Sequence, residues 1–407
     1  MLERGGMSSP YRWVVLAVAT VAFMQTHLHR MAFAPLIPTF VGDLGLSYAA
    51  AGTIQTAYFW TYTAAQIPVG LVADRWGVRR VMLVCMALLA AGALVFALSG
   101  GYGEAVVARM IVGLGAAAVW VPGMRLLSEW FPPSERGRAT GLMSAGGGFG
   151  GTLALILVPI VAAGWGWRTA YGVLAVPALV TLALIVFGLR AGPPTAATAP
   201  ASRARGALRR VLASRRLLPL NLAVLFSYGG YFSFLTFLPS FLVRQLDMTN
   251  PQAGLVTALI TAGTIVSWPL AGLLSDRLGR RKPVYLASQG LSALACVVFA
   301  LGAPHFTPWT VAATAIATGL LVGGMIVPFV MVIELFPPEL AATAAGVTNA
   351  ACFVGGMVLP IVLGVIVDVT GGFAVAFLVA AAVQVVALGL GALVVETGPG
   401  RYTAERA

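Results

Sequence analysis

Long apolar runs, separated by short segments that hold nearly all of the charge, constrain this chain more than any other feature. Hydrophobic residues make up 59% of the 407 residues and charged residues only 9%, which is too little charge to cover the surface of a soluble domain. A helix of about 20 apolar residues crosses a hydrocarbon core about 30 Å thick. We therefore predict twelve membrane-spanning helices, at 12–40, 49–72, 80–99, 104–130, 138–162, 169–189, 217–243, 252–274, 283–302, 308–334, 342–367 and 373–396.

Two charged loops occur twice, half the chain apart. The segment 70–80, GLVADRWGVRR, returns at 272–282 as GLLSDRLGRRK, and the segment EWFPP after Ser128 returns as ELFPP after Ile333. A chain that repeats the loops between its membrane helices is a duplicated set of helices. We predict an all-α polytopic membrane protein of two pseudo-symmetric six-helix bundles, with these domain boundaries: 1–190, a cytoplasmic linker at 191–216 that is Pro/Ala-rich and then basic, and 217–407.

The distribution of basic residues predicts the orientation in the membrane. The net charge is +12, and most of the 25 Lys and Arg residues fall on one side if both termini are cytoplasmic. This charge favours contact with anionic lipid, not with nucleic acid. We predict a monomeric, multi-pass protein of a bacterial cytoplasmic (inner) membrane. The three cysteines lie inside predicted helices without metal-ligand spacing, so we predict no disulfide, metal or cofactor.

Arg30 lies deep inside the first apolar run. Counted along a helix at 1.5 Å per residue from Arg12 and from Asp43, it is about 27 Å and about 20 Å from the two ends. A charged side chain at such a depth costs at least about 2.5 kcal/mol and by default marks a functional site. No Asp or Glu of the sequence lies at a similar depth. We predict that the substrate supplies the negative charge; satisfaction by carbonyl groups and water is the alternative.

His27 lies one helical turn before Arg30 on the same face, whereas His29 points away and is expected to pack. His27 could bind a proton near physiological pH and couple transport to it, or could line the cavity as a neutral polar group. Because the chain offers no deep carboxylate as a proton carrier, uniport and anion exchange stay open beside proton symport.

Polar side chains recur along one face of the second predicted helix, where they could orient a substrate by hydrogen bonds. The seventh and eleventh helices add further polar groups. We predict that the substrate-binding residues of these helices are Gln55, Tyr58, Tyr62, Gln66, Tyr228, Tyr231 and Asn349, with simple packing as the alternative for each tyrosine.

The repeated loop, together with Arg109-Met-Ile-Val-Gly113-Leu-Gly115 at the start of the fourth predicted helix, resembles the major facilitator superfamily over essentially the whole chain. The resemblance implies two bundles that flank a central cavity and open it alternately to each side.

Two segments are similar to the organic-anion branches of that superfamily, the anion:cation symporter and organophosphate-antiporter groups. They are Arg30–Pro38 and Arg125–Arg136. The similarity implies that Arg30 binds the anion and that Arg125 acts in binding or coupling, although Arg125 lies near the cytoplasmic edge and a pair with Glu129 is nearly as plausible. The position that matches Arg30 in the second half is Tyr231, and a single cationic anchor favours a monoanion over a phosphate ester.

The repeated loops are candidates for a latch that must open during transport, because carboxylates at matching positions can pair with nearby arginines. The alternative is a static topology signal. The second half has no arginine after Glu334 that would correspond to Arg136 and Arg138, so we expect its latch to be weaker. The candidate gating residues are Asp74, Arg75, Arg79, Glu129, Arg136, Arg138, Asp276, Arg277, Arg280 and Glu334.

We predict a secondary active transporter of a small organic anion, a monocarboxylate or a sugar acid, with proton coupling left open. The alternative is an exporter of drugs or neutral metabolites of the same fold, which a deep acidic residue would have favoured. We predict no enzymatic activity, because no nucleophile, base or metal ligands cluster in the sequence.

Overall fold

The computed structural model describes residues 10–189 and 208–398. Within these ranges the chain is helical and contains no strand. This is expected of apolar segments in a bilayer, where a helix satisfies its own backbone hydrogen bonds. A short helical stretch at 208–212 precedes the first long helix of the second half, and the Pro/Ala-rich part of the predicted linker lies outside the described residues.

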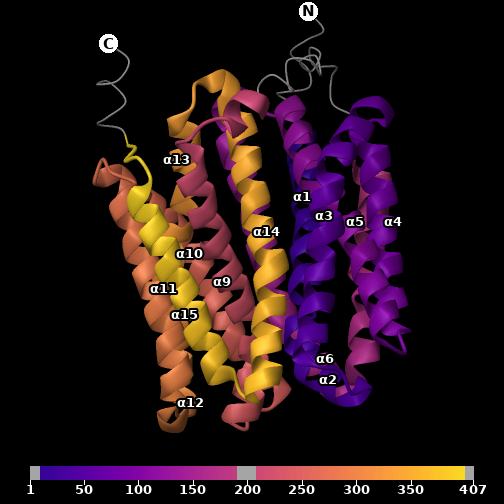
Figure 1. Ribbon diagram of the computed structural model, residues 1–407. Helices are drawn as coiled ribbons and strands as arrows, with labels where there is room; N and C mark the ends of the chain where they lie inside the picture. The colour runs from indigo at the N-terminus through magenta and orange to yellow at the C-terminus, as the bar shows by residue number, and fades with distance from the viewer. Residues whose placement is uncertain (1–9, 190–207, 399–407) are drawn as a thin grey trace, which may run out of the picture. The chain divides into compact units, whose positions relative to one another are not determined.

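The first half of the chain forms seven α-helices and one short 3-10 helix (Figure 1). They are α1 (Tyr11–Met31), η1 (Ala34–Leu36), α2 (Ile37–Leu44), α3 (Tyr48–Trp76), α4 (Val78–Ala97), α5 (Tyr102–Trp130), α6 (Pro133–Val173) and α7 (Ala175–Gly188). The predicted first span is thus a broken helix, made of α1, η1 and the start of α2. The predicted fifth and sixth spans follow each other almost without a loop, since α6 continues past a non-helical residue at Gly166.

The second half repeats this plan. Its elements are α9 (Leu217–Gln245), α10 (Asn250–Arg277), α11 (Lys282–Gly302), η2 (Ala303–His305), α12 (Pro308–Leu321), η3 (Val322–Ile326), α13 (Val327–Leu335), α14 (Pro338–Thr370) and α15 (Phe373–Leu393). Helix pairing repeats as well: α1 packs on α6 as α9 packs on α14, and α4 packs on α7 as α11 packs on α15. The structure therefore carries the duplication that the repeated loops predicted.

The described chain divides into two compact units. One unit contains α1, η1, α2 and α4–α7, most of α3, and residues 248–258; the other contains the remaining helices of the second half together with residues 47–52. The domain boundaries predicted above differ from this division in those two short segments, and they stay a prediction.

Close helix contacts in both units depend on glycine. A Cβ added at Gly150 on α6 would lie 2.3 Å from the Met24 carbonyl oxygen of α1, and one at Gly355 on α14 would lie 2.0 Å from the Leu225 carbonyl oxygen of α9. No real Cβ atom approaches this closely, so only glycine lets these helices touch backbone to backbone. Helices are therefore tightly packed at the glycine-rich stretch of α6, residues 146–151, and at residues 355–356 of α14.

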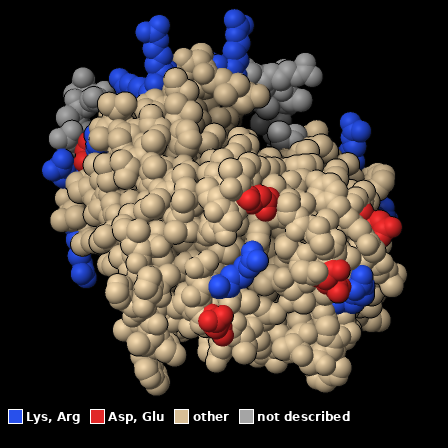
Figure 2. All heavy atoms as spheres, turned by 60° about the horizontal axis from the view of Figure 1, so that its bottom comes forward, with Lys and Arg blue, Asp and Glu red and all other residues tan. Residues whose placement is uncertain are grey.

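Nine helices in the described part of the chain are long and apolar enough to cross a membrane, and one of them, the 54-residue stretch Glu135–Gly188, is long enough for two passes. The first predicted span, at 12–40, and α3 are more polar and complete the twelve spans. Figure 2 shows a face with few charged side chains, of both signs, whereas Lys and Arg side chains project at its upper edge. The protein is an all-α, multi-pass membrane protein with twelve spans.

Candidate functional site

The first membrane-spanning segment is interrupted immediately after Arg30. Helix α1 ends at Met31, and the chain continues through η1 into α2. Pro35 lies in η1, and Pro38 lies in the first turn of α2. Proline has no backbone N–H and its ring clashes with the carbonyl group four residues earlier, so a straight helix does not continue here. The last turn of α1 therefore has carbonyl groups that need hydrogen-bond donors from elsewhere.

Side chains of α3 and α5 supply these donors. Arg109 Nη1 donates to the His29 carbonyl oxygen at 2.8 Å, and Gln55 Nε2 donates to the Arg30 carbonyl oxygen at 3.3 Å. Arg109 Nη2 also donates to the side-chain oxygen of Gln55 at 3.3 Å. Irregular backbone at membrane depth is tolerated where protein groups satisfy it. The break in α1 is thus a fixed feature, and it places Arg30 at the end of a half-helix, where the helix dipole favours a cation.

The Arg30 side chain lies among aromatic rings. Arg30 exposes only 6% of its surface, and its guanidinium carbon lies within cation–π distance of three ring centroids: Tyr58 at 5.6 Å, Phe59 at 5.6 Å and Tyr62 at 5.2 Å. The Tyr58 hydroxyl donates to the Thr26 carbonyl oxygen at 3.2 Å, which fixes the ring. We call Tyr58, Phe59 and Tyr62 the ring cage.

His27 contacts Arg30 directly, with 3.3 Å between Nε2 and the Arg30 Nη1. A guanidinium can only donate hydrogen bonds, so Nε2 must be the accepting, unprotonated nitrogen. The proton of a neutral His27 then lies on Nδ1, which is 3.4 Å from the Phe23 carbonyl oxygen and 3.2 Å from the Thr26 hydroxyl. This arrangement assigns His27 as a neutral imidazole whose tautomer is set by Arg30.

The predicted polar stripe of α3 lies partly at this site. Tyr62 stacks on Tyr58 with ring centroids 5.6 Å apart and an interplanar angle of 15°. Gln55 is buried, and Gln66, one turn beyond Tyr62, is half-buried. Among the predicted substrate-binding residues of the first half, the structure brings together Arg30, His27, Gln55, Tyr58 and Tyr62.

Arg109 is a residue of this site that the sequence analysis did not include among the binding residues. It is fully buried. Its Nε donates to the Ile54 carbonyl at 3.4 Å, and Nη1 donates to the Tyr171 hydroxyl at 3.2 Å. With the hydrogen bonds to His29 and Gln55 included, each of these acceptors of the Arg109 guanidinium is a neutral group. The signal that could have found it was the motif Arg109–Gly115, since a small residue one turn after the arginine lets α5 approach α3.

Arg125 pairs with Glu129 on its own helix, with 3.0 Å between Nε and Oε1. That Glu129, Arg136 and Arg138 join one latch network stays a prediction. Arg136 donates to the carbonyl groups of Ser128, at 2.7 Å, and Phe131, at 3.1 Å, and so caps the end of α5. The pair of Arg125 and Glu129 lies near the end of α5, and pairing with Glu129 is the alternative left open beside a role of Arg125 in binding or coupling.

The predicted binding residues of the second unit lie on α9 and α14. The Tyr228 hydroxyl donates to the Met325 carbonyl oxygen at 3.2 Å. Met325 is part of η3, the interruption between α12 and α13. Tyr231 is buried and Asn349 is half-buried. In both units, therefore, a buried tyrosine donates to a backbone carbonyl group at or near an interrupted helix.

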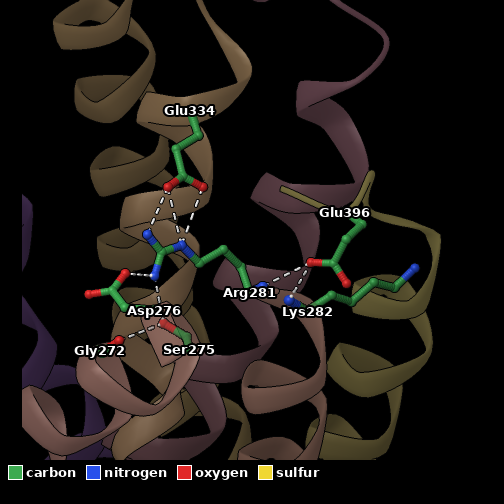
Figure 3. A network of polar contacts seen from close by, with 7 residues as sticks. All are labelled: Gly272, Ser275, Asp276, Arg281, Lys282, Glu334 and Glu396. Atoms are coloured by element: carbon green, nitrogen blue, oxygen red, sulfur yellow. Dashed lines mark hydrogen bonds and ion pairs between the residues drawn. The ribbon is translucent and has the colours of Figure 1, made fainter. Parts of the chain in front are cut away.

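A network of charged groups joins three helix ends of the second unit (Figure 3). The Arg281 guanidinium binds both Glu334, at 2.8 Å, and Asp276, and its Nη1 also donates to the Ser275 hydroxyl at 2.7 Å. Glu334 first, and Asp276 with it, raise the pKa of Arg281 above its ordinary value. Glu334 thus has an arginine partner, which the repeated loop itself supplies. That the second latch is the weaker one stays a prediction.

The other predicted gating residues are placed differently. Arg280 pairs with Glu396 at 3.3 Å, and Arg277 is exposed. In the first unit, Arg79 occupies the position that matches Arg281, but it donates to the Val186 carbonyl oxygen at the end of α7. Of the other predicted gating residues in the first half, Arg75 and Arg138 are exposed. The side chain of Asp74 lies outside the described residues.

The carboxylates of the described residues lie at helix ends or in loops: each Asp and Glu falls in a loop or within three residues of a helix end. Arg30 also lies next to a helix end, that of α1, but this end falls inside the first membrane-spanning segment. The site thus combines a buried cation, aromatic rings, a neutral imidazole and a buried amide, which suits a small solute with a negatively charged group.

Comparison with known proteins agrees with this architecture. The sequence model of the family described as Major Facilitator Superfamily matches residues 18–249 and 220–406. A probable sulfoacetate transporter of Cupriavidus necator is 27% identical, over 94% of this chain and 92% of its own. A hexuronate transporter of Bacillus subtilis is 22% identical, over 94% of both chains. A bacterial homologue of the human lysosomal transporter Spinster, solved in an inward-facing conformation, has a TM-score of 0.82 at 18% identity, over 95% of this chain and 97% of its own.

Proposed function

Because the chain belongs to the Major Facilitator Superfamily, we propose that it is a secondary transporter that moves a small organic anion by alternating access. The protein is a transporter and not an enzyme. We place it in a bacterial cytoplasmic membrane with both termini inside, and we take the substrate to be a monocarboxylate, a sulfonate or a sugar acid. The observation that carries the proposal is the buried Arg30 at the break in α1.

The electrostatics of this position support an anionic substrate. Burying a guanidinium in a membrane costs at least about 2.5 kcal/mol. The ring cage and the end of α1 stabilise the guanidinium and offset part of this free energy. An anion that binds Arg30 gains a charge-assisted, bidentate hydrogen bond in a medium of low dielectric. A neutral solute can accept hydrogen bonds from the same group but gains no charge–charge attraction, and a cation is repelled.

The relatives are consistent with this chemistry. Similar proteins carry names that refer to sulfoacetate, hexuronate, galactarate and glucarate, and nitrate or nitrite. These solutes differ in size and shape but are all anions. A single fixed cation with adaptable polar neighbours such as Gln55 and Tyr62 would serve this class of solute, with the neighbours deciding which member binds.

The geometry around Arg30 supports a role for His27 in proton coupling, which we include in the proposal. While His27 Nε2 accepts from Arg30, it is not available to a proton. An anion that engages the Arg30 guanidinium would free Nε2 and reduce the repulsion from the guanidinium charge. Protonation of His27 would then accompany anion binding, which is the linkage that a symporter requires.

The charged network of the second unit would act in the conformational cycle. Ion pairs among Arg281, Asp276 and Glu334 tie together the ends of α10 and α13 and the start of α11. We propose that these contacts stabilise one conformation of the transporter and loosen in the other, together with Asp74 and its neighbours in the first half. Their removal would change turnover more than substrate affinity.

The proposal is tested by uptake into proteoliposomes of a panel of labelled anions: sulfoacetate, D-glucuronate, D-glucarate, lactate and a sugar phosphate. We expect uptake of at least one carboxylate or sulfonate. In Arg30→Lys, this uptake should fall by about tenfold or more, because lysine keeps the charge but lacks the planar fork that binds two oxygens.

Arg168→Lys is the matched control, since Arg168 is half-exposed and pairs with Asp43 at the protein surface. It should transport like the wild type. Arg30→Lys with normal uptake at normal membrane levels would contradict the anchoring role. With D-glucose added to the panel as a neutral solute, uptake of D-glucose and of none of the anions would overturn anion transport itself.

A further inference from the structure

The chain that follows α15 returns to the loop between α10 and α11. Val394 is 2% exposed and packs in a core cluster with Leu217 and Tyr285. Four residues later, a Cβ added at Gly398 would lie 2.3 Å from the Gly279 carbonyl oxygen, so the two backbones touch there. We call residues 394–398 the C-terminal strap. It is held by apolar burial at one end and by a backbone contact at the other.

Glu396 forms the polar centre of this strap (Figure 3). Its Oε1 accepts hydrogen bonds from the backbone N–H groups of Arg281 and Lys282, both at 2.9 Å. Its Oε2 lies 3.3 Å from Arg280 Nε. The Thr397 carbonyl oxygen also accepts from the Arg281 N–H at 3.1 Å. The carboxylate side chain is only 7% exposed.

These contacts lie at the N-terminus of α11, where N–H groups have no partners within the helix and a carboxylate is favoured by the helix dipole. Among the residues bound by the strap, Arg281 also belongs to the charged network. Its backbone is bonded to the strap, and its side chain reaches Asp276 and Glu334. The strap therefore sets the position of the backbone from which the guanidinium bridges α10 and α13.

The first half of the chain offers no equivalent group. Residues 186–195, which follow the matching helix, contain no Asp or Glu. The matching arginine, Arg79, donates to a backbone carbonyl oxygen in α7. The carboxylate that holds the repeated loop is thus a feature of the second half alone.

We propose that Glu396 is a positioning residue for transport: it holds the backbone of Arg281 and Lys282 so that the Arg281 guanidinium can close the network with Asp276 and Glu334. This inference rests on the gating role proposed for that network. It adds that the chain beyond the last membrane helix takes part in the conformational cycle, through a contact that does not involve substrate.

The contact itself is tested by hydrogen–deuterium exchange of the full-length protein in nanodiscs, without substrate. In Glu396→Ala, the amide of Lys282 should exchange about tenfold faster, because it loses its charge-assisted hydrogen bond. The amide of Arg281 should change less, because it keeps its hydrogen bond to the Thr397 carbonyl oxygen. In Glu396→Gln both amides should stay within about threefold of the wild type, since the side-chain amide oxygen still accepts. Arg280→Gln is the matched control: it removes an exposed ion pair and leaves the backbone contacts. Equal exchange in Glu396→Ala and the wild type would overturn the inference.

The consequence for transport is measured with the anion of the panel that the wild type takes up fastest. We expect Glu396→Ala to change kcat by about threefold or more with little change in KM, and Glu396→Gln to restore most of it. Arg281→Gln tests the network separately. If Arg281→Gln changes kcat and Glu396→Ala does not, the positioning role is wrong and the network stands. If Arg281→Gln leaves kcat unchanged, the proposed gating role itself fails.

Discussion

Gly113→Ala should destabilise the protein at the point where α5 meets α3 behind the ring cage. An added Cβ would lie 2.1 Å from the Tyr58 carbonyl oxygen and 2.5 Å from the Thr61 hydroxyl oxygen. Ordinary contact begins at 3.4 Å, so the helices would have to separate by about 1.3 Å at this level. The nearest atom belongs to the backbone, and no side-chain rotation can relieve the overlap.

The expected magnitude follows from three terms. Overpacking costs about 1–3 kcal/mol, and loss of the 2.6 Å hydrogen bond from Thr61 to the Met110 carbonyl costs about 1 kcal/mol. Alanine returns about 1 kcal/mol through its higher helix propensity. The net loss is about 2 kcal/mol, which for a unit of this size corresponds to a decrease in Tm of about 4–8 °C.

Gly103→Ala on the same helix is the control, because an added Cβ there meets no atom within 4 Å. The assay is thermal unfolding of the purified protein in detergent, followed by uptake of the best panel anion. We expect Gly103→Ala to match or exceed the wild-type Tm. Gly113→Ala should melt lower and should raise the KM of uptake, since Tyr58 moves with its backbone. Equal Tm values for the two alanine variants would refute the argument from close packing.

Two further predictions concern fixed charges of the first unit. Arg109→Lys should lower Tm by several degrees, because one ammonium group cannot bind all the carbonyl and side-chain acceptors that the guanidinium binds. Arg30→Lys should instead lower uptake with little change in Tm. Thermal unfolding and uptake measured on both variants check this contrast. Hydrogen bonds from Trp167, then from Arg168, lower the pKa of Asp43 below its ordinary value of 3.8, so its contribution to stability is present above about pH 4 and is lost as the pH falls through the lowered pKa. Tm measured between pH 6 and pH 3 should therefore fall less in Asp43→Asn than in the wild type, and equal slopes would contradict this assignment.

Local patterns predicted much of the fold and part of the site. Spanning helices follow from apolar length alone, since lipid leaves the backbone few other choices. Arg30 stood out because a charge inside an apolar run is visible in a single window of sequence. The spacing of Gln55, Tyr58 and Tyr62 placed them on one face of α3, and the structure has all three at or beside Arg30.

Other features depend on contacts between segments far apart in the chain. Arg109 is only seven residues from the start of α5, about 10 Å along the helix, and a count from the helix end suggested a position near the surface. Its burial becomes apparent only when Tyr171 and His29 are seen around it. The break in α1 was likewise hidden, because the run through Pro35 stays apolar and hydropathy does not register a missing backbone donor.

The second-half network shows most clearly why the spacing within one motif does not reveal the partners of its residues. No arginine follows Glu334 within a few residues, whereas Arg136 and Arg138 follow Glu129 in the first half. The partner, Arg281, lies 53 residues before Glu334. The group that binds the Arg281 backbone, Glu396, lies 115 residues after Arg281. Two copies of a duplicated unit can therefore keep the same loop sequence while closing it with different groups. Once the halves differ in this way, the two loops need not contribute equally to the conformational equilibrium.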